Sequence, residues 1–444
     1  MRIQLSHNLK AEWPAIACSL GFALAMCGQM TAWALRGYTP FAKSIVFPAV
    51  PVLIALVLLV RSRWFVKAQF AVDKTFVLFP VLLLFFPFTA LEFIDPIQNK
   101  EAVVYQAYLC ILTILVGLNK REDFEHIPIA TLIVGTIGCV APLAEFLSSP
   151  IAALGRMSVA GSGNPLAVAT NGSLTFYAAL VVGTWSGKNS TITGFLAALA
   201  AALGASNVIL SGTRSGMLAI AVSIPIFALL HLLAKRRASA VERSHRRNIS
   251  FFLTLLLIGA VLPGIVTTVI APQMLNGILK TVLSRVDSLA MLSSAGPHET
   301  SASVHANLMK YNWDNLDFWG HGINAQSVHQ GDGIYAHNIF LQAFYDLGFV
   351  GGLVVLVAGI VIPVALIVLR WRRFGITGLE SFIILAYANS QFDFNFHGTP
   401  YSWGQWLPPV LIYTLFPPAR PHPNEQNRIE DELQTPEPRY SPSA

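Results

Sequence analysis

Residues 191–237 read TITGFLAALAAALGASNVILSGTRSGMLAIAVSIPIFALLHLLAKRR. Two apolar runs, at 191–210 and 214–233, flank the polar turn Ser211-Gly212-Thr213-Arg214-Ser215-Gly216. Each run is long enough to cross the hydrocarbon core of a bilayer, which takes about 20 helical residues. Because the turn is too short to hold another element, this stretch predicts two adjacent membrane-spanning helices.

The rest of the chain has the same character. The 444 residues are 54% hydrophobic and 12% charged, whereas soluble globular chains are about 25% charged. The sequence therefore predicts an all-α polytopic membrane protein of about twelve transmembrane helices. The expected spans are 13–33, 44–60, 75–93, 102–118, 127–147, 165–185, 191–210, 214–233, 249–271, 340–369, 379–394 and 401–417.

The basic residues are distributed unevenly between the two faces of this arrangement. With the N-terminus in the cytoplasm, most of the 29 Lys and Arg residues fall in cytoplasmic segments. The positive-inside rule then places both termini in the cytoplasm. This topology explains the basic pI, so the charge does not indicate a nucleic-acid partner. The opposite face receives Arg36, Lys43, Lys100, Arg156, Arg214, Lys280, Arg285 and Lys310.

Two segments depart from the apolar pattern. Residues 272–336 form one long outward loop between the ninth and tenth spans, too polar to cross a membrane, and such loops commonly carry function. Residues 417–444 are rich in Pro, Glu and Arg, which predicts a disordered cytoplasmic tail. We expect one transmembrane domain over 1–416, with the loop inserted in it.

Three expected helices begin on the outer face with unusual residues. Asn164-Pro165 would start one helix after Arg156, Arg214 starts the second, and His337-Asn338 precedes the third. Helix N-termini present unpaired N–H groups and favour anions, so these starts together suggest a diphosphate-binding site. Other readings remain open, because Arg156 could extend to the interface and His337 could be an ordinary loop histidine.

The histidines of the outer face do not predict a metal site. Their spacing places no two imidazoles on one helical face, there is no HExxH pair, and no cysteine accompanies them. A phosphate-binding loop or dinucleotide fingerprint is also missing from the sequence, so we expect no metal and no cofactor. These histidines are His298, His305, His321, His329, His337 and His397.

Three short motifs resemble those of one superfamily. His337-Asn338 followed by Gly348 and Gly351 fits the H-N-x9-G-x2-G pattern of the O-antigen ligases. The turn at 211–216 resembles the Ser-x-Thr/Ser-Arg-x-Gly element of the wider O-antigen ligase and polymerase superfamily. Arg156 with Asn164-Pro165 resembles its third marker. By motif, the resemblance covers residues 150–360.

The resemblance implies an inverting, metal-independent glycosyltransferase of GT-C architecture in the bacterial inner membrane, with a periplasmic active site. Such an enzyme moves O-antigen polysaccharide from undecaprenyl diphosphate to lipid A-core during lipopolysaccharide biosynthesis. Its implied partners are these two lipids and the surrounding membrane lipids.

The resemblance also implies roles for individual residues. Arg214 and Arg156 would bind the diphosphate, and His337 would lie beside the reacting centre, with Asn338 as acceptor or structural support. The superfamily's second loop arginine is missing near Ser301–His305. Either Arg285 would replace it, or this role would be absent. Arg285 and Lys280 would equally suit the binding of acidic headgroups.

Competing functions remain open. An O-antigen polymerase would share the diphosphate site, and Arg285 followed by Gly296 resembles a polymerase loop motif. A protein O-oligosaccharyltransferase is a third relative. A transporter is the rival from another class, although no internal repeat supports it. The sequence does not indicate the oligomeric state.

Overall fold

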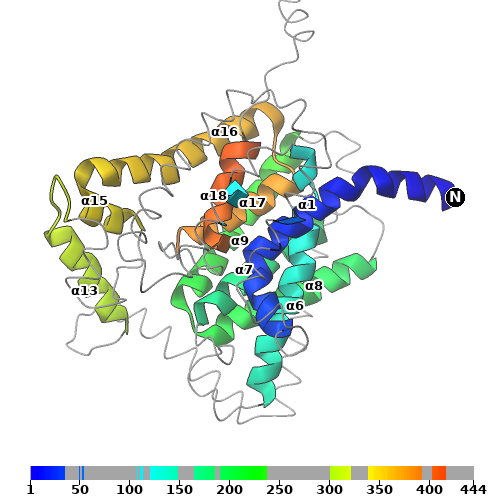
Figure 1. Ribbon diagram of the computed structural model, residues 1–444, viewed down its shortest axis with the longest axis horizontal. Helices are drawn as coiled ribbons and strands as arrows, with labels where there is room; N and C mark the ends of the chain where they lie inside the picture. The colour runs from blue at the N-terminus through cyan, green and yellow to red at the C-terminus, as the bar shows by residue number, and fades with distance from the viewer. Residues whose placement is uncertain are drawn as a thin grey trace, which may run out of the picture.

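The computed structural model (Figure 1) describes residues 2–35, 50, 53–54, 108, 111–113, 121–148, 165–185, 191–237, 301–321, 339–392 and 403–416. Within these ranges every regular element is helical and none is a strand. The predicted all-α polytopic membrane fold is therefore confirmed. Five helical stretches are long and apolar enough to cross a bilayer: Ile127–Glu145, Pro165–Trp185, Ile192–Ser211, Ser215–Ala234 and Phe340–Phe374.

The count of about twelve spans stays a prediction. The expected spans 44–60, 75–93, 102–118 and 249–271 lie largely or wholly outside the described residues. Four long helices agree closely with the expected ranges: α6 (Ile127–Ser148), α7 (Pro165–Trp185), α8 (Thr191–Ser211) and α9 (Arg214–Arg237). The first helix, α1 (Arg2–Leu35), includes the expected span 13–33 but begins 11 residues before it.

Helix α7 is the centre of the bundle. Its residues 167–184 are buried without interruption, as expected for a helix that is surrounded by others. Glycines allow close approach: a Cβ on Gly172 would lie 2.6 Å from the carbonyl oxygen of Gly204 in α8, and a Cβ on Gly204 would lie 2.5 Å from that of Gly172. Such small-residue contacts are typical of helix packing in membranes.

Buried polar side chains also join these helices. The amide nitrogen of Asn171 in α7 donates to the carbonyl oxygen of Gly135 in α6 at 3.1 Å. Asn207 in α8 donates to the carbonyl oxygen of Cys139 at 3.2 Å. Thr31 in α1 donates to the carbonyl oxygen of Val134 at 3.0 Å. Hydrogen bonds of this kind hold adjacent helices in register where apolar packing alone is unspecific.

The expected tenth span, 340–369, is not one straight helix. It consists of α15 (Ile339–Leu356), the π-helix η4 (Val357–Val361) and α16 (Ile362–Phe374), and the chain reverses at Gly348 (φ 73°, ψ −174°). Phe344 then packs against Gly352 and Phe340 against Gly359, pairs that a straight helix would hold about 12 and 28 Å apart. The bent α15 and α13 (Ser301–Asp314) lie together at one side of the molecule (Figure 1).

Two shorter helices pack against the π-helix. The hydroxyl of Tyr387 in α17 (Gly378–Ser390) donates to the carbonyl oxygen of Gly359 at 2.6 Å. The hydroxyl of Tyr413 in α18 (Trp403–Leu415) donates to that of Ala358 at 2.5 Å. Each of these helices has 13 residues, about 20 Å in length, which is shorter than the ~30 Å core of a bilayer.

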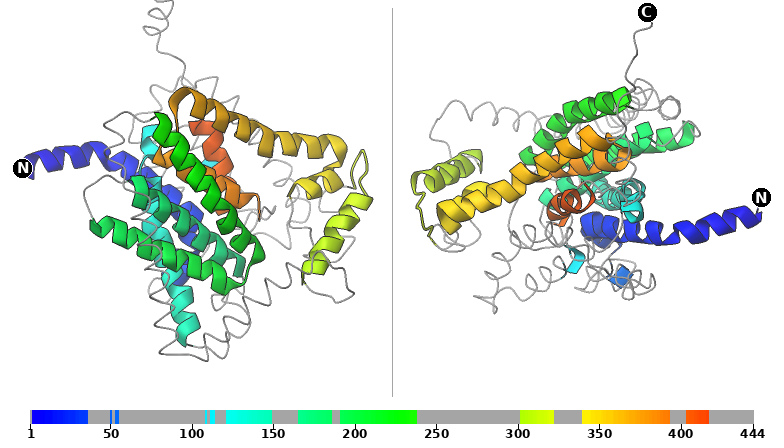
Figure 2. Two further views of the ribbon diagram at one scale, coloured as in Figure 1. Left: turned by 180° about the vertical axis from the view of Figure 1, so that it is seen from behind. Right: turned by 90° about the horizontal axis from the view of Figure 1, so that it is seen from above.

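An ion-pair cluster marks one end of the bundle. The buried carboxylate of Glu380, at the start of α17, binds Arg121 of η2 (Arg121–Phe124) at 2.8 Å and Arg370 of α16 at 3.0 Å. Thr377 and Glu380 form a capping box for α17. Arg121 and Arg370, which the charge pattern places on the cytoplasmic face, thus lie together at one end of the bundle. From there α17 packs against α7, α9 and α18. Figure 2 shows the whole bundle from behind and from above.

Candidate functional site

The turn between α8 and α9 has a closed, rigid geometry. Gly212 (φ 63°) ends α8, a left-handed conformation that suits glycine at this position. The buried hydroxyl of Ser211 donates to the carbonyl oxygen of Val208 at 2.7 Å and lies 3.0 Å from the Thr213 hydroxyl. The carbonyl oxygen of Thr213 accepts from the Met217 N–H at 3.1 Å. Thr213 is therefore the cap of α9, and Arg214 is its first helical residue.

The start of α9 presents backbone N–H groups that have no partner within the helix. The N–H groups of the first helical turn have no partner four residues earlier in the helix, and they form the positive end of its dipole. Gly216 keeps this turn close to α7, because a Cβ there would lie 2.9 Å from the Thr213 hydroxyl oxygen and 3.1 Å from the Cβ of Ala169. The arrangement favours a bound anion.

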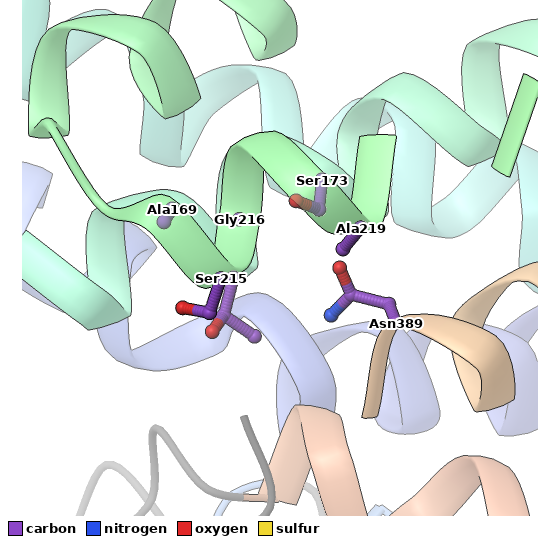
Figure 3. Close-up of a pocket in the computed structure, with 7 residues that line it drawn as sticks. Ala169, Ser173, Ser215, Gly216, Ala219 and Asn389 are labelled. Atoms are coloured by element: carbon purple, nitrogen blue, oxygen red, sulfur yellow. The ribbon is translucent and has the colours of Figure 1, made fainter. Parts of the chain in front are cut away.

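A small pocket opens beside this helix start (Figure 3). The enclosed space is small and has room for about one water molecule. It therefore suits one end or one group of a larger molecule. Its lining comes from α7, α9 and α17: Ala169, Thr170, Ser173, Ser215, Gly216, Ala219 and Asn389.

The polar side chains of the pocket can donate hydrogen bonds. Ser173 is fully buried, and its hydroxyl lies near that of Tyr177 without a hydrogen bond of normal geometry among the described residues. Asn389 is 4% exposed, and its Oδ1 accepts a bond from the Tyr177 hydroxyl at 3.0 Å. This bond leaves the amide nitrogen available, and Figure 3 shows it on the side of Ser215. The polar part of the lining thus consists of hydroxyl and amide groups, which can donate hydrogen bonds, and the lining has no acidic residue.

The sequence did not single out Ser173 or Asn389. The sequence signal that could have found them is a polar residue inside an apolar run, here 165–185 for Ser173 and 379–394 for Asn389. Such residues are costly in a membrane and often functional. That signal alone does not distinguish Asn389, which lines the pocket, from Asn171, whose side chain forms a hydrogen bond from α7 to α6. Only the packing of α7, α9 and α17 shows which of these polar residues share a pocket.

The structure reaches the predicted site residues only in part. Arg214 is the first residue of α9, and its side chain lies outside the described atoms. Arg156, Arg285, His337 and Asn338 lie outside the described residues. Two expected helix starts are confirmed, because α7 begins at Pro165, nine residues after Arg156, and α15 begins at Ile339, directly after Asn338.

The glycines of the H-N-x9-G-x2-G motif have a backbone role. Gly348 (φ 73°) packs against Gly320 (φ 75°), and a Cβ on Gly348 would lie 2.3 Å from the carbonyl oxygen of Phe318. The His321 N–H donates to the Tyr345 carbonyl and the Phe349 N–H to the Phe318 carbonyl, both at 3.0 Å. We call this pairing of 318–321 with 345–349 the glycine clasp. It fixes the segment after α13 to the helix that follows His337-Asn338.

These observations define a class: a polytopic helical membrane protein with an anion-favouring helix start beside a donor-lined pocket. The family model for O-antigen ligase matches residues 199–356. This match confirms the resemblance to the O-antigen ligases that the motifs at 211–216 and 337–351 indicate. The matched range includes the α8–α9 turn, the glycine clasp and His337-Asn338. No curated protein matches the chain.

Proposed function

We propose that this protein is an O-antigen ligase, a GT-C glycosyltransferase that moves O-antigen polysaccharide from undecaprenyl diphosphate to lipid A-core with inversion. The observation that carries the proposal is the position of Arg214. It is the first residue of α9, beside a donor-lined pocket and inside the O-antigen ligase match. We place the protein in the bacterial inner membrane, with this end periplasmic and both termini cytoplasmic.

The donor diphosphate would bind at the start of α9. Arg214 offers a planar fork that matches paired phosphate oxygens, and the N–H groups of the first turn add donors. The pocket is too small for a sugar diphosphate, so it would receive one phosphoryl oxygen, with Asn389 and Ser173 as donors. Arg156 and Arg285 would complete the charge compensation.

The acceptor reaction would then proceed in one displacement. A hydroxyl oxygen of lipid A-core attacks the anomeric carbon, its proton passes to the imidazole of His337, and the bond from that carbon to the diphosphate oxygen breaks. Undecaprenyl diphosphate leaves with the electron pair, stabilised by the arginines. Asn338 would orient the acceptor or the ring of His337. The alternative role for His337 is to donate a proton to the leaving diphosphate.

We further propose that transfer needs no divalent metal, nucleotide or other cofactor. The spacing of histidines and carboxylates in the sequence supports this, as does the supply of arginines. Purified protein should transfer glycan in excess EDTA. Turnover that stops in EDTA and returns with Mg²⁺ or Mn²⁺ would show that a metal, and not the arginines, neutralises the leaving group.

An O-antigen polymerase is the second candidate, because the matched segment and the diphosphate site would serve both reactions. The lipopolysaccharide gel pattern of a deletion strain separates them. Loss of a ligase leaves bare core while lipid-linked polymer accumulates. Loss of a polymerase leaves core that carries one repeat. If the protein is instead a transporter, its loss would leave glycan transfer by the purified transferases unaffected.

A further inference from the structure

A group of aromatic residues is exposed next to the glycine clasp. The exposed fraction is 82% for Trp319, 55% for Phe318 and 55% for Phe349. Contiguous exposed apolar surface of this kind usually marks a contact with another molecule or with a membrane. We call these three residues the aromatic patch.

The aromatic patch has a fixed shape. The rings of Phe318 and Phe349 are stacked, with centroids 6.4 Å apart and planes at 12°. The ring of Trp319 meets that of Phe318 edge-on at 5.0 Å. Both segments that carry the patch are joined by the two backbone hydrogen bonds of the glycine clasp. The patch is thus a preformed surface and not the side chains of a free loop.

The patch continues an apolar stripe on the helix that follows Gly348. Along α15, η4 and α16, one face is exposed at Val350, Leu353, Val354, Val357, Val361 and Val364. Apart from the adjacent pair Leu353 and Val354, these residues recur every three or four positions, as one helical face does. In a helix apolar enough to cross a membrane, such a face meets lipid. Phe349 begins the stripe, and Phe318 and Trp319 extend it beyond the end of the helix.

The charged residues next to the aromatic patch indicate how deep this end of the helix lies in the bilayer. Asp317 precedes the patch and is exposed, as is Asp314 at the end of α13. Carboxylates avoid the hydrocarbon core, whereas Trp and other aromatic side chains concentrate at the boundary between acyl chains and headgroups. The boundary between acyl chains and headgroups accommodates both the carboxylates and the aromatic rings at neighbouring depths. Another protein surface would have no reason to continue the lipid-facing stripe.

We propose that Phe318, Trp319 and Phe349 form an anchor that inserts into the membrane interface at the outer end of this helix. The partner is the lipid bilayer itself. The proposal depends on the membrane character of the chain and not on its enzymatic activity. If the proposed function also holds, the anchor has a further effect. Through the glycine clasp it fixes the level of Ile339, and so of the adjacent His337-Asn338, relative to the bilayer surface.

Depth-dependent fluorescence quenching tests the anchor. Cys18, Cys27 and Cys139 are buried and therefore protected from the label. The full chain would carry Cys110→Ser, so that the introduced cysteine is the one that reacts. Trp319→Cys is then labelled with bimane, and the protein is reconstituted in phosphatidylcholine nanodiscs. A nitroxide is placed either near the head of the acyl chain or near its end. The matched control is Lys310→Cys, exposed on α13. Phe349→Cys supplies a second patch position, and thermal unfolding confirms that each labelled protein is folded.

The expected result is quenching at positions 319 and 349 that is several-fold stronger with the shallow nitroxide than with the deep one. The label at position 310 should be quenched several-fold less than either. Absence of quenching at 319 and 349 would mean that the patch faces water or another protein, and it would overturn the anchor. Stronger quenching by the deep nitroxide would also overturn it, because the patch would then lie in the core.

Discussion

Gly348 and Gly375 have nearly the same backbone conformation, but only Gly348 is packed against another segment. Their dihedral angles are φ 73°, ψ −174° and φ 77°, ψ −172°. A Cβ on Gly348 would lie 2.3 Å from the Phe318 carbonyl oxygen, whereas a Cβ on Gly375 would have nothing within 4 Å. The pair therefore separates the cost of the conformation from the cost of lost packing.

We predict that Gly348→Ala destabilises the protein more than Gly375→Ala. Each substitution places a side chain in a region that is nearly restricted to glycine, at a cost of about 1–3 kcal/mol. Gly348→Ala adds a collision with the backbone of the glycine clasp, worth a further ~1–3 kcal/mol if the segments separate only slightly. Thermal unfolding in detergent measures both. Equal losses of stability would show that the clasp contributes little to the fold.

Much of the bundle follows from local sequence signals. The expected helix at 165–185 matches α7, and the expected start at Arg214 matches α9, because hydropathy, the Pro165 start and the short turn are properties of neighbouring residues. The reversal at Gly348 was missed. Hydropathy does not distinguish one long apolar helix from two that pack on each other, and the positive φ of Gly348 depends on its contact with Gly320.

The candidate site also has one part that the sequence predicts and another that it does not. The start of α9 was predicted from the charge of Arg214 and the turn sequence, both local. Asn389 was missed, because its place in the pocket depends on how α17 crosses α7 and α9. A single sequence gives no register for that crossing. The predicted partners of Arg214, namely Arg156, Arg285 and His337, stay predictions.

The membrane topology can be tested by cysteine accessibility. Charge asymmetry predicts that residues 272–336 are periplasmic and that the segment after α9 is cytoplasmic. Ser294→Cys should therefore react with an impermeant thiol reagent in intact cells, and Ser239→Cys should react only after lysis. The reverse labelling pattern would place Arg214 in the cytoplasm and exclude the proposed reaction with a periplasmic donor.

The role of His337 can be tested by pH dependence. A general base contributes about 10²- to 10⁴-fold to a rate, so His337→Ala should retain donor binding and lose most turnover. His337→Gln should be nearly as poor, because an amide cannot take the proton. Transfer by the native protein should fall as the pH drops through the pKa of the His337 imidazole, because a protonated ring cannot accept the proton. Activity that instead rises toward acid pH, and does so only with His337, would identify a proton donor to the leaving group.

Arg214 should be needed for its geometry and not only for its charge. A guanidinium binds two phosphate oxygens at once, whereas an ammonium is a point charge. Arg214→Lys should therefore lower transfer by about 10-fold or more, which corresponds to ~1.4 kcal/mol, while thermal stability is retained. Lys235→Arg, at the other end of α9, is the matched control and should transfer normally. If the Arg214→Lys protein is as active as the native protein, Arg214 is only a surface charge.

Asn389 should bind the donor through its amide group. Asn389→Asp would place a carboxylate in a pocket that is lined by hydrogen-bond donors and lies next to the start of α9. Like charges brought together cost several kcal/mol, so affinity for the diphosphate donor should fall by about 10²-fold or more. Asn389→Ala should lose less, since it removes a donor without adding repulsion. Tyr177→Phe removes the hydrogen bond to Asn389 Oδ1 and leaves this buried oxygen without its partner. It adds no charge, so it should cost about 1–3 kcal/mol of stability while donor affinity falls far less than in Asn389→Asp. Donor binding, measured together with thermal unfolding of the free protein, separates repulsion from misfolding. If the folded Asn389→Asp protein binds donor as tightly as the native protein, the pocket does not receive the diphosphate, and the anion site is confined to the Arg214 side of the helix start.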